Sequence, residues 1–159
     1  MSARQCFVGI DVAKAQLDIA LRPTGERWAV GNDDAGIAAL VERLQALQPT
    51  LIVLEATGGY QRAVVAALAA AGLPVAVVNP RQARDVAQAT GQLAKTDALD
   101  ARALAHVAEA VRPTPRPLPD AQADERRALL ARRRPLVAMR TAEQNRLGHA
   151  PPRLQTDIQ

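Results

Sequence analysis

The pattern of strands changes at residue 51, and this change limits the folds that the chain can adopt. Before it, β-rich segments at 5–11, 16–22 and 26–31 are separated by turns, which predicts an antiparallel meander. After it, continuous apolar runs at 51–54 and 74–78 alternate with segments of helical length, which predicts parallel strands joined by helices. The combination predicts an α/β fold with a mixed five-stranded sheet flanked by helices.

The segments between the strands carry helix signals. Apolar residues recur at helical spacing after Asn32 and Asp33, either of which can cap a helix that Pro49 ends. Further helices are expected at about 60–71, 81–90 and 97–111. These helices are long enough to cover both faces of the sheet.

The last third of the chain differs from the rest in charge. Residues 1–111 hold ten Lys and Arg against eleven Asp and Glu, whereas 112–159 hold ten against five. Four prolines within 112–119 predict an extended linker, and 120–159 then favours an Arg-rich helical arm with a kink at Pro135. A basic arm is common in nucleic-acid-binding proteins, although a solvated basic helix explains the charge equally well. The arginines expected to contact nucleic acid are Arg126, Arg127, Arg132, Arg133, Arg134 and Arg140.

Composition excludes several classes of protein. No run approaches the roughly 18 apolar residues of a membrane span, and the N-terminus lacks a signal-peptide pattern. The single cysteine, Cys6, excludes an internal disulfide and a cysteine-clustered zinc site, and we expect it to be buried in the first strand and inert. We therefore expect a soluble, cytoplasmic protein without a membrane partner.

Four acidic residues are candidates for a metal site. Asp11 follows the first strand and Glu55 follows the first parallel strand, so their carboxylates meet at one edge of the sheet if the strands are neighbours. Asp97 and Asp100 lie three apart and would share a helix face. Carboxylates brought together repel one another unless cations neutralise them, and hard oxygen ligands suit Mg²⁺ or Mn²⁺. Two such ions would clamp a phosphodiester.

Most of these acids also have a structural interpretation. Asp11 can be a turn residue, while Asp97 can cap its helix with Asp100 in the first turn. Glu55, at the end of an apolar run, has no evident structural duty. Asp18 is interpreted as a solvated residue on the polar face of its strand.

Both lysines of the chain fall near these acids. Of the twenty Lys and Arg residues, only Lys14 and Lys95 are lysines. An ammonium group at such an edge can contact a phosphate or keep an acid ionised. Both are therefore included among the expected nucleic-acid-binding residues.

Four successive motifs resemble those of the DEDD insertion-sequence transposases. They are FVGIDVAK at 7–14, LEATGGY at 54–60, Asn79-Pro80 and KTDALDA at 95–101. The resemblance implies an N-terminal domain similar to the RuvC Holliday-junction resolvase, with a ribonuclease H-like fold. It also implies a metal-binding tetrad and DNA strand exchange guided by a structured RNA, and we expect a homo-oligomer. The tetrad would be Asp11, Glu55, Asp97 and Asp100.

The chain departs from that family in one respect. Members carry a second domain with a nucleophilic serine, and nothing after residue 150 resembles it, while the only serine is Ser2. The chain is therefore expected to be an N-terminal portion.

Two other interpretations stay open. One is a non-catalytic nucleic-acid-binding module with structural acids. The other is half of a sugar-kinase or actin-like ATPase. Such ATPases need a Gly- and Thr-rich turn after the first aspartate, where this chain has Val12-Ala13-Lys14-Ala15.

Overall fold

The computed structural model describes residues 4–92, 99–115 and 121–149, with the side chains of 121–128 excepted. The chain divides into two compact units, Met1–Leu118 and Pro119–Gln159. The first unit contains a five-stranded sheet with the order β3-β2-β1-β4-β5. The strands are β1 (Phe7–Val12), β2 (Gln16–Arg22), β3 (Arg27–Gly31), β4 (Leu51–Glu55) and β5 (Val75–Val78).

The strand directions confirm the predicted mixed sheet. β1, β2 and β3 form an antiparallel meander, whereas β4 runs parallel to β1 and β5 runs parallel to β4. This order and these directions are those of the ribonuclease H-like fold, as the motifs implied. The predicted strand 16–22 matches β2, and the other predicted strands differ from the observed ones by at most two residues at either end.

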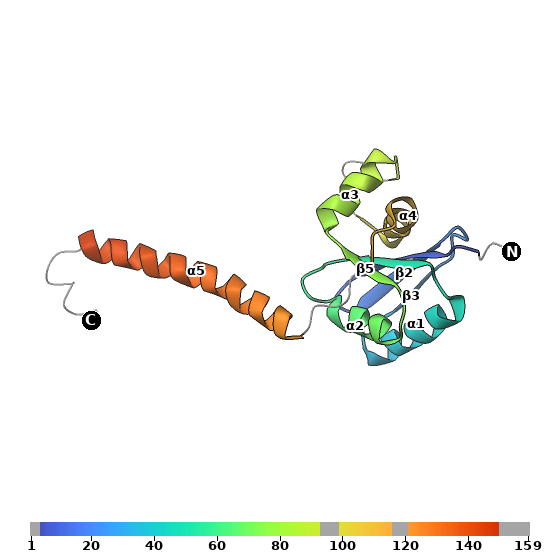
Figure 1. Cartoon of the computed structure of the whole chain (residues 1–159), viewed down its shortest axis with the longest axis horizontal. Helices are drawn as coiled ribbons and strands as arrows, with labels where there is room; N and C mark the ends of the chain where they lie inside the picture. Colours follow the sequence, from blue (N-terminus) through green and yellow to red (C-terminus); the bar gives the residue numbers. More distant parts are fainter. Residues whose placement is uncertain (1–3, 93–98, 116–120, 150–159) are drawn as a thin grey trace. The chain divides into compact units, whose positions relative to one another are not determined.

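Helices cover both faces of this sheet. Figure 1 shows α1 and α2 on one face and α3 and α4 on the other. Their spacing in the sequence was predicted, but α4 begins at Ala101 and not near residue 97, because Asp100 is its N-cap. The helices of the first unit are α1 (Asp34–Leu47), α2 (Arg62–Ala70), α3 (Pro80–Ala89) and α4 (Ala101–Val111).

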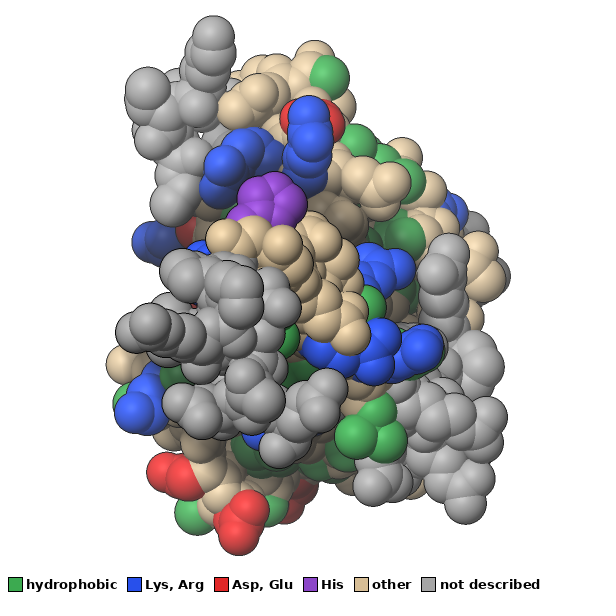
Figure 2. Space-filling model, turned by 90° about the vertical axis from the view of Figure 1, so that its left-hand side faces the viewer, with side chains coloured by type: hydrophobic (Ala, Val, Ile, Leu, Met, Phe, Trp, Pro, Cys, Tyr) green, Lys and Arg blue, Asp and Glu red, His purple; other side chains and the backbone are tan. Residues whose placement is uncertain are grey.

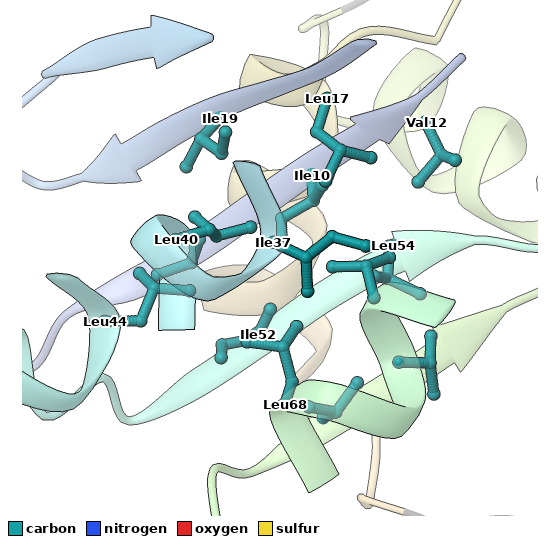
Figure 3. Close-up of a cluster of buried hydrophobic side chains, with 14 of the residues drawn as sticks. Ile10, Val12, Leu17, Ile19, Ile37, Leu40, Leu44, Ile52, Leu54 and Leu68 are labelled. Atoms are coloured by element: carbon teal, nitrogen blue, oxygen red, sulfur yellow. The ribbon is translucent and has the colours of Figure 1, made fainter. Parts of the chain in front are cut away.

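The larger hydrophobic core lies between the sheet and the pair α1 and α2. Alternate residues of each strand point into it, so Ile10 of β1 and Ile52 of β4 pack against Leu40 of α1 and Leu68 of α2 (Figure 3). All four side chains are fully buried. This layer anchors the central strands that carry the candidate acids.

The core on the opposite face is built from smaller side chains. Phe7 and Val53 of the sheet pack against Leu104 of α4 and Ala83 of α3. Alanines predominate here on the helix side, which lets the helices lie close to the sheet.

Gly9 of β1 allows the closest approach of a helix to the sheet. A Cβ atom at this position would overlap with the carbonyl oxygen of Ala101 and the amide nitrogen of Ala105, so backbone of α4 occupies the space that a side chain would need. Only glycine permits this contact. The first turn of α4 is therefore held against the strand that ends in the candidate site.

Cys6 differs from its prediction. It precedes β1 and is half-buried instead of lying fully buried within the strand. Burial raises the pKa of its thiol, and the nearby Glu26 carboxylate raises it further. A protonated thiol is a poor nucleophile, which is in line with the expectation that Cys6 is not a reactive residue.

The second unit contains one long helix, α5 (Ala121–His149). Pro135 lies within it, and the helix continues on both sides of the proline. Its described side chains are almost all exposed, among them Leu129, Leu136 and Met139. In the described part of the chain, no helix is long and apolar enough to cross a membrane.

Substitution of Gly9 tests the contact between α4 and β1. Gly9→Ala should lower the free energy of unfolding by about 3 kcal/mol, because the added methyl group meets backbone atoms that cannot rotate away. The matched control is Gly148→Ala, since a Cβ there meets no atom within 4 Å. Thermal unfolding followed by circular dichroism measures both. An unchanged melting temperature for Gly9→Ala would contradict the close contact.

Candidate functional site

Asp11 and Glu55 lie side by side at the carboxyl ends of the parallel strands. Ile10 of β1 pairs with Leu54 of β4, and the two acids are the next residues on these strands. Because Ile10 and Leu54 point toward α1 and α2, the acids point to the opposite face, toward α4. The structure thus brings these two predicted residues together.

The pKa values of the two acids show that they share one electrostatic environment. Burial raises the pKa of Asp11, and the charges of Asp18 and Asp100 raise it further, against a smaller opposing effect of a hydrogen bond from the Val12 backbone. Burial also raises the pKa of Glu55, followed by the charge of Asp11, while the Thr57 hydroxyl and Arg84 lower it. The carboxylates therefore repel one another at this edge.

Asp100 reaches the site from the start of α4, but not as predicted. It is the N-cap of the helix, with extended backbone, and its side chain accepts a hydrogen bond from Ala103 N at 2.8 Å. The sequence predicted that Asp100 lies within a helix and shares a face of it with Asp97. This is wrong, because the helix begins only at Ala101, after Asp100. Asp100 combines the capping role with a position near Asp11. Asp97 lies outside the described residues.

Asp18 is an acid of this edge that sequence reasoning placed elsewhere. It pairs directly with Asp11 across β1 and β2, is half-buried, and accepts a hydrogen bond from Gln16 at 2.8 Å. Asp18 is therefore only partly solvated, and the interpretation missed its place beside Asp11. The sequence feature that could have located Asp18 is the short connection between β1 and β2. It fixes the register of the hairpin and therefore pairs Asp18 with Asp11.

Asn32 holds the two acid-bearing loops together. Its side-chain amide donates to the Ala13 carbonyl, in the loop after Asp11, and to the Tyr60 carbonyl, in the loop after Glu55, at 2.9 and 3.2 Å. The sequence suggested Asn32 or Asp33 as a helix cap, and Asp33 takes that role by accepting from Gly36 N. The role of Asn32 depends on tertiary contacts, which the sequence pattern does not show.

The glycines after Glu55 shape a tight turn. Gly58 and Gly59 both have positive φ angles, of 57° and 94°. The Gln61 side chain accepts hydrogen bonds from Thr57 N and Gly59 N, each at 3.1 Å. The loop is therefore ordered by its own side chains next to Glu55.

The predicted basic residues are distributed over both units. Lys14 is exposed in the connection after β1, and Lys95 lies outside the described residues. Figure 2 shows that Lys and Arg side chains, in blue, are exposed at the surface. The side chains of Arg126 and Arg127, on α5, are not described. The other predicted arginines of α5, Arg132, Arg133, Arg134 and Arg140, are exposed.

The site offers oxygen ligands but no complete cation cage in the described part of the chain. Within residues 4–92, 99–115 and 121–149, no three Asp, Glu, His or Cys side chains are close enough to hold a metal ion. The donors at this edge are carboxylates whose mutual repulsion a cation would relieve. Such hard donors fit Mg²⁺ or Mn²⁺.

Comparison with known families decides the relationship of the chain. Residues 8–150 match the model of the IS110-type DEDD transposases, which is described as a transposase. The chain belongs to this family. This match confirms the family resemblance that the sequence motifs indicated. A search of curated proteins found no match to the sequence.

Solved structures with similar folds are distant in sequence. RuvC of Thermus thermophilus in complex with a Holliday junction substrate is 18% identical, with a TM-score of 0.45, over 76% of this chain and 88% of that chain. A second Thermus thermophilus RuvC structure is 20% identical, with a TM-score of 0.41, over 72% and 85%. The polyphosphate/ATP-glucomannokinase of Arthrobacter sp. strain KM is 18% identical, with a TM-score of 0.42, over 59% and 52%. At these TM-scores the similarities do not bear on the activity of the transposase-family chain.

The raised pKa of Asp11 predicts how the stability of the folded chain depends on pH. Between about pH 4 and neutral pH, the folded chain holds more protons at this group than the unfolded chain, so the group lowers the free energy of unfolding as pH rises. Asp11→Asn should therefore raise the melting temperature at neutral pH by roughly 2–4 °C in metal-free buffer, and the gain should vanish below about pH 4.

Thermal melts across this pH range measure the effect. The control is Asp85→Asn, which removes an exposed carboxylate of α3 with the same change in charge. A destabilised Asp11→Asn variant at neutral pH would show that the carboxylate makes favourable contacts and is not repelled by its neighbours.

Proposed function

We propose that this chain carries the acidic site of a DNA transposase and acts on phosphodiesters with a divalent metal ion. The observation that supports this most directly is the placement of Asp11 and Glu55 side by side on one face of the carboxyl edge, with Asp100 close enough to raise the pKa of Asp11. These acids come from three separate elements, β1, β4 and the start of α4. Membership of the DEDD transposase family supplies the class of substrate, DNA.

The proposed role of each residue follows from its position. Asp11, Glu55 and Asp100 would hold Mg²⁺ or Mn²⁺ together with Asp97. When bound, the ion supplies Lewis-acid stabilisation of the phosphodiester oxygens. β1 and β4 fix the positions of Asp11 and Glu55, and the Thr57 hydroxyl lies 3.5 Å from the Glu55 carboxylate, which it can orient.

Two basic side chains are close enough to the site to take part in binding. Arg84 of α3 lies near enough to Glu55 to lower the pKa of that carboxyl, and its side chain is otherwise exposed. Lys14 is exposed in the loop after Asp11. Both can contact phosphates on either side of the reacting one.

The proposal also includes binding partners of the chain. A structured guide RNA and a second copy of the chain are proposed as partners, in line with the family resemblance. The basic α5 is the surface proposed to contact nucleic acid, because the arginines described on it are exposed and the arm has no Phe, Tyr or Trp for base stacking. Its contacts would therefore be with the phosphate backbone.

A non-catalytic nucleic-acid-binding module is the second candidate. One observation favours it: among the described residues, no three acidic, His or Cys side chains are close enough to hold a metal. In that case the acids are structural. Metal binding distinguishes the two candidates.

Metal binding should stabilise the folded chain. An ion that binds only the folded form at tenfold its Kd adds about 1.4 kcal/mol to the free energy of unfolding. Mg²⁺ and Mn²⁺ should therefore raise the melting temperature, and Asp11→Asn combined with Glu55→Gln should abolish the rise. The matched control is Asp85→Asn with Glu42→Gln, which makes the same charge change at exposed positions. An equal metal response in the double variant of the site would rule out the acids as ligands.

The arginines of α5 should supply backbone-directed affinity for nucleic acid. Replacing Arg132, Arg133 and Arg134 by alanine should weaken binding to DNA and RNA alike and flatten the dependence of log K on log salt, by about 0.9 per lost phosphate contact for duplex DNA. The same three residues changed to lysine form the control, because they keep the charge. Fluorescence anisotropy at several salt concentrations measures both. Binding that survives the alanine variant would place the nucleic-acid surface on the sheet domain.

A further inference from the structure

The face of β3 on the side of α4 is an open surface beside the acidic site. β3 is an edge strand, and α4 packs on β1, β2 and β4 instead. On this face β3 presents Arg27 and Ala29, and both are exposed. An exposed alanine in mid-strand leaves a shallow floor with no large side chain above it.

The other face of β3 is firmly anchored. Trp28 points to the layer of α1 and packs against the larger core, and the Arg43 guanidinium of α1 lies 3.8 Å from the centre of its ring. Arg43 also pairs with Glu26, just before β3. The open face is therefore supported from behind by a packed layer.

A pocket of about 460 Å³ joins this open face to the acidic site. Asp11, Asp18 and Asp100 line one side of it, and Ala29 forms part of its floor. Because Asp11, Asp18 and Ala29 pair in one row across β1, β2 and β3, the floor extends roughly 10 Å from Asp11, or two strand spacings. This room is enough for one nucleotide unit.

Two arginines, Arg27 and Arg102, complete the wall of this pocket. We call it the Arg27–Arg102 pocket. Arg27 lies on β3, opposite Ala20, and its exposed guanidinium forms no hydrogen bond or ion pair with the described residues. Arg102 lies in the first turn of α4. Its Nε atom forms an ion pair with an Asp100 carboxylate oxygen at 3.6 Å, and its side chain is 68% exposed. Both guanidinium groups are thus exposed to solvent, where a ligand can reach them.

We infer that the Arg27–Arg102 pocket binds the nucleotide next to the reacting phosphate of a DNA strand. The charge pattern supports this assignment, because the carboxylates lie at the end shared with the acidic site and the arginines lie along the rest of the wall. A strand with its reacting phosphate at Asp11 places the following sugar over Ala29, and Arg27 and Arg102 hold the next phosphate. Guanidinium groups suit such contacts because they offer paired donors to phosphate oxygens. The assignment rests on the proposed function.

The experiment measures the affinity of the full chain for a fluorescein-labelled single-stranded DNA oligonucleotide in the presence of Mg²⁺. Arg27→Gln with Arg102→Gln should weaken binding about tenfold and lower the slope of log K against log salt by about 0.7, the value for one phosphate of a single strand. Arg4→Gln, at the opposite end of β1, is the control for general loss of charge.

A matched pair at Ala29 tests the floor of the pocket. Ala29→Glu should weaken DNA binding, because it adds a negative charge where the nucleotide lies, whereas Ala29→Gln adds nearly the same volume without charge and should bind more tightly than Ala29→Glu. Thermal melts establish that each variant is folded. Equal affinities for Ala29→Glu and Ala29→Gln would contradict a phosphate-bearing ligand.

The outcomes separate this inference from the proposed function. If Mg²⁺ still raises the melting temperature but the arginine variants bind DNA like the unsubstituted chain, the pocket assignment is wrong and the proposed function stands. If the metal response is absent from the unsubstituted chain, the proposed function itself fails. An RNA oligonucleotide of the same sequence forms the last arm. Loss of RNA affinity with unchanged DNA affinity would overturn the assignment to DNA.

Discussion

The contact between α4 and Gly9 determines the geometry of the rest of the first unit. The backbone of the first turn of α4 lies directly on β1, and Ala20, Ala101 and Ala105 fill the small space around this contact. As a consequence, the residue that caps α4, Asp100, comes near Asp11, two residues beyond Gly9 on the same face of the strand. A close helix–sheet contact thus places an acid from a distant part of the sequence.

The alternation of side chains along β1 explains why a packed strand ends in a polar site. Ile10 enters the larger core, so Asp11 must point to the other face, and the same rule places Glu55 after Leu54. Burial raises the pKa of both carboxyls; the charges of Asp18 and Asp100 raise the pKa of Asp11 further, and the charge of Asp11 raises that of Glu55. This arrangement costs stability in the metal-free chain, and the fully buried side chains beneath it offset the cost.

The sequence allowed the sheet to be predicted because each of its strands has a local signature. The antiparallel segments are bounded by turns, and the parallel ones are continuous apolar runs, so Asp11 and Glu55 could be placed at a common edge. The contributions of Asp18 and Asn32 could not be predicted as readily, because they depend on hairpin register and on loops distant in sequence. The start of α4 was predicted too early, since Asp97 and Asp100 are both suitable N-caps and only packing selects Asp100.

The charges around the site couple the binding of metal to the binding of nucleic acid. Carboxylates at the edge repel a phosphate, and a divalent cation removes that repulsion, so each ligand should bind more tightly when the other is present. Thermodynamic linkage requires that this effect be the same in both directions. Arg27, Arg84 and Arg102 also favour the binding of a phosphate at this edge, and Arg84 and Arg102 in addition interact with Glu55 and Asp100. An edge with acids at its centre and arginines around it is therefore suited to a polyanion that arrives together with a cation.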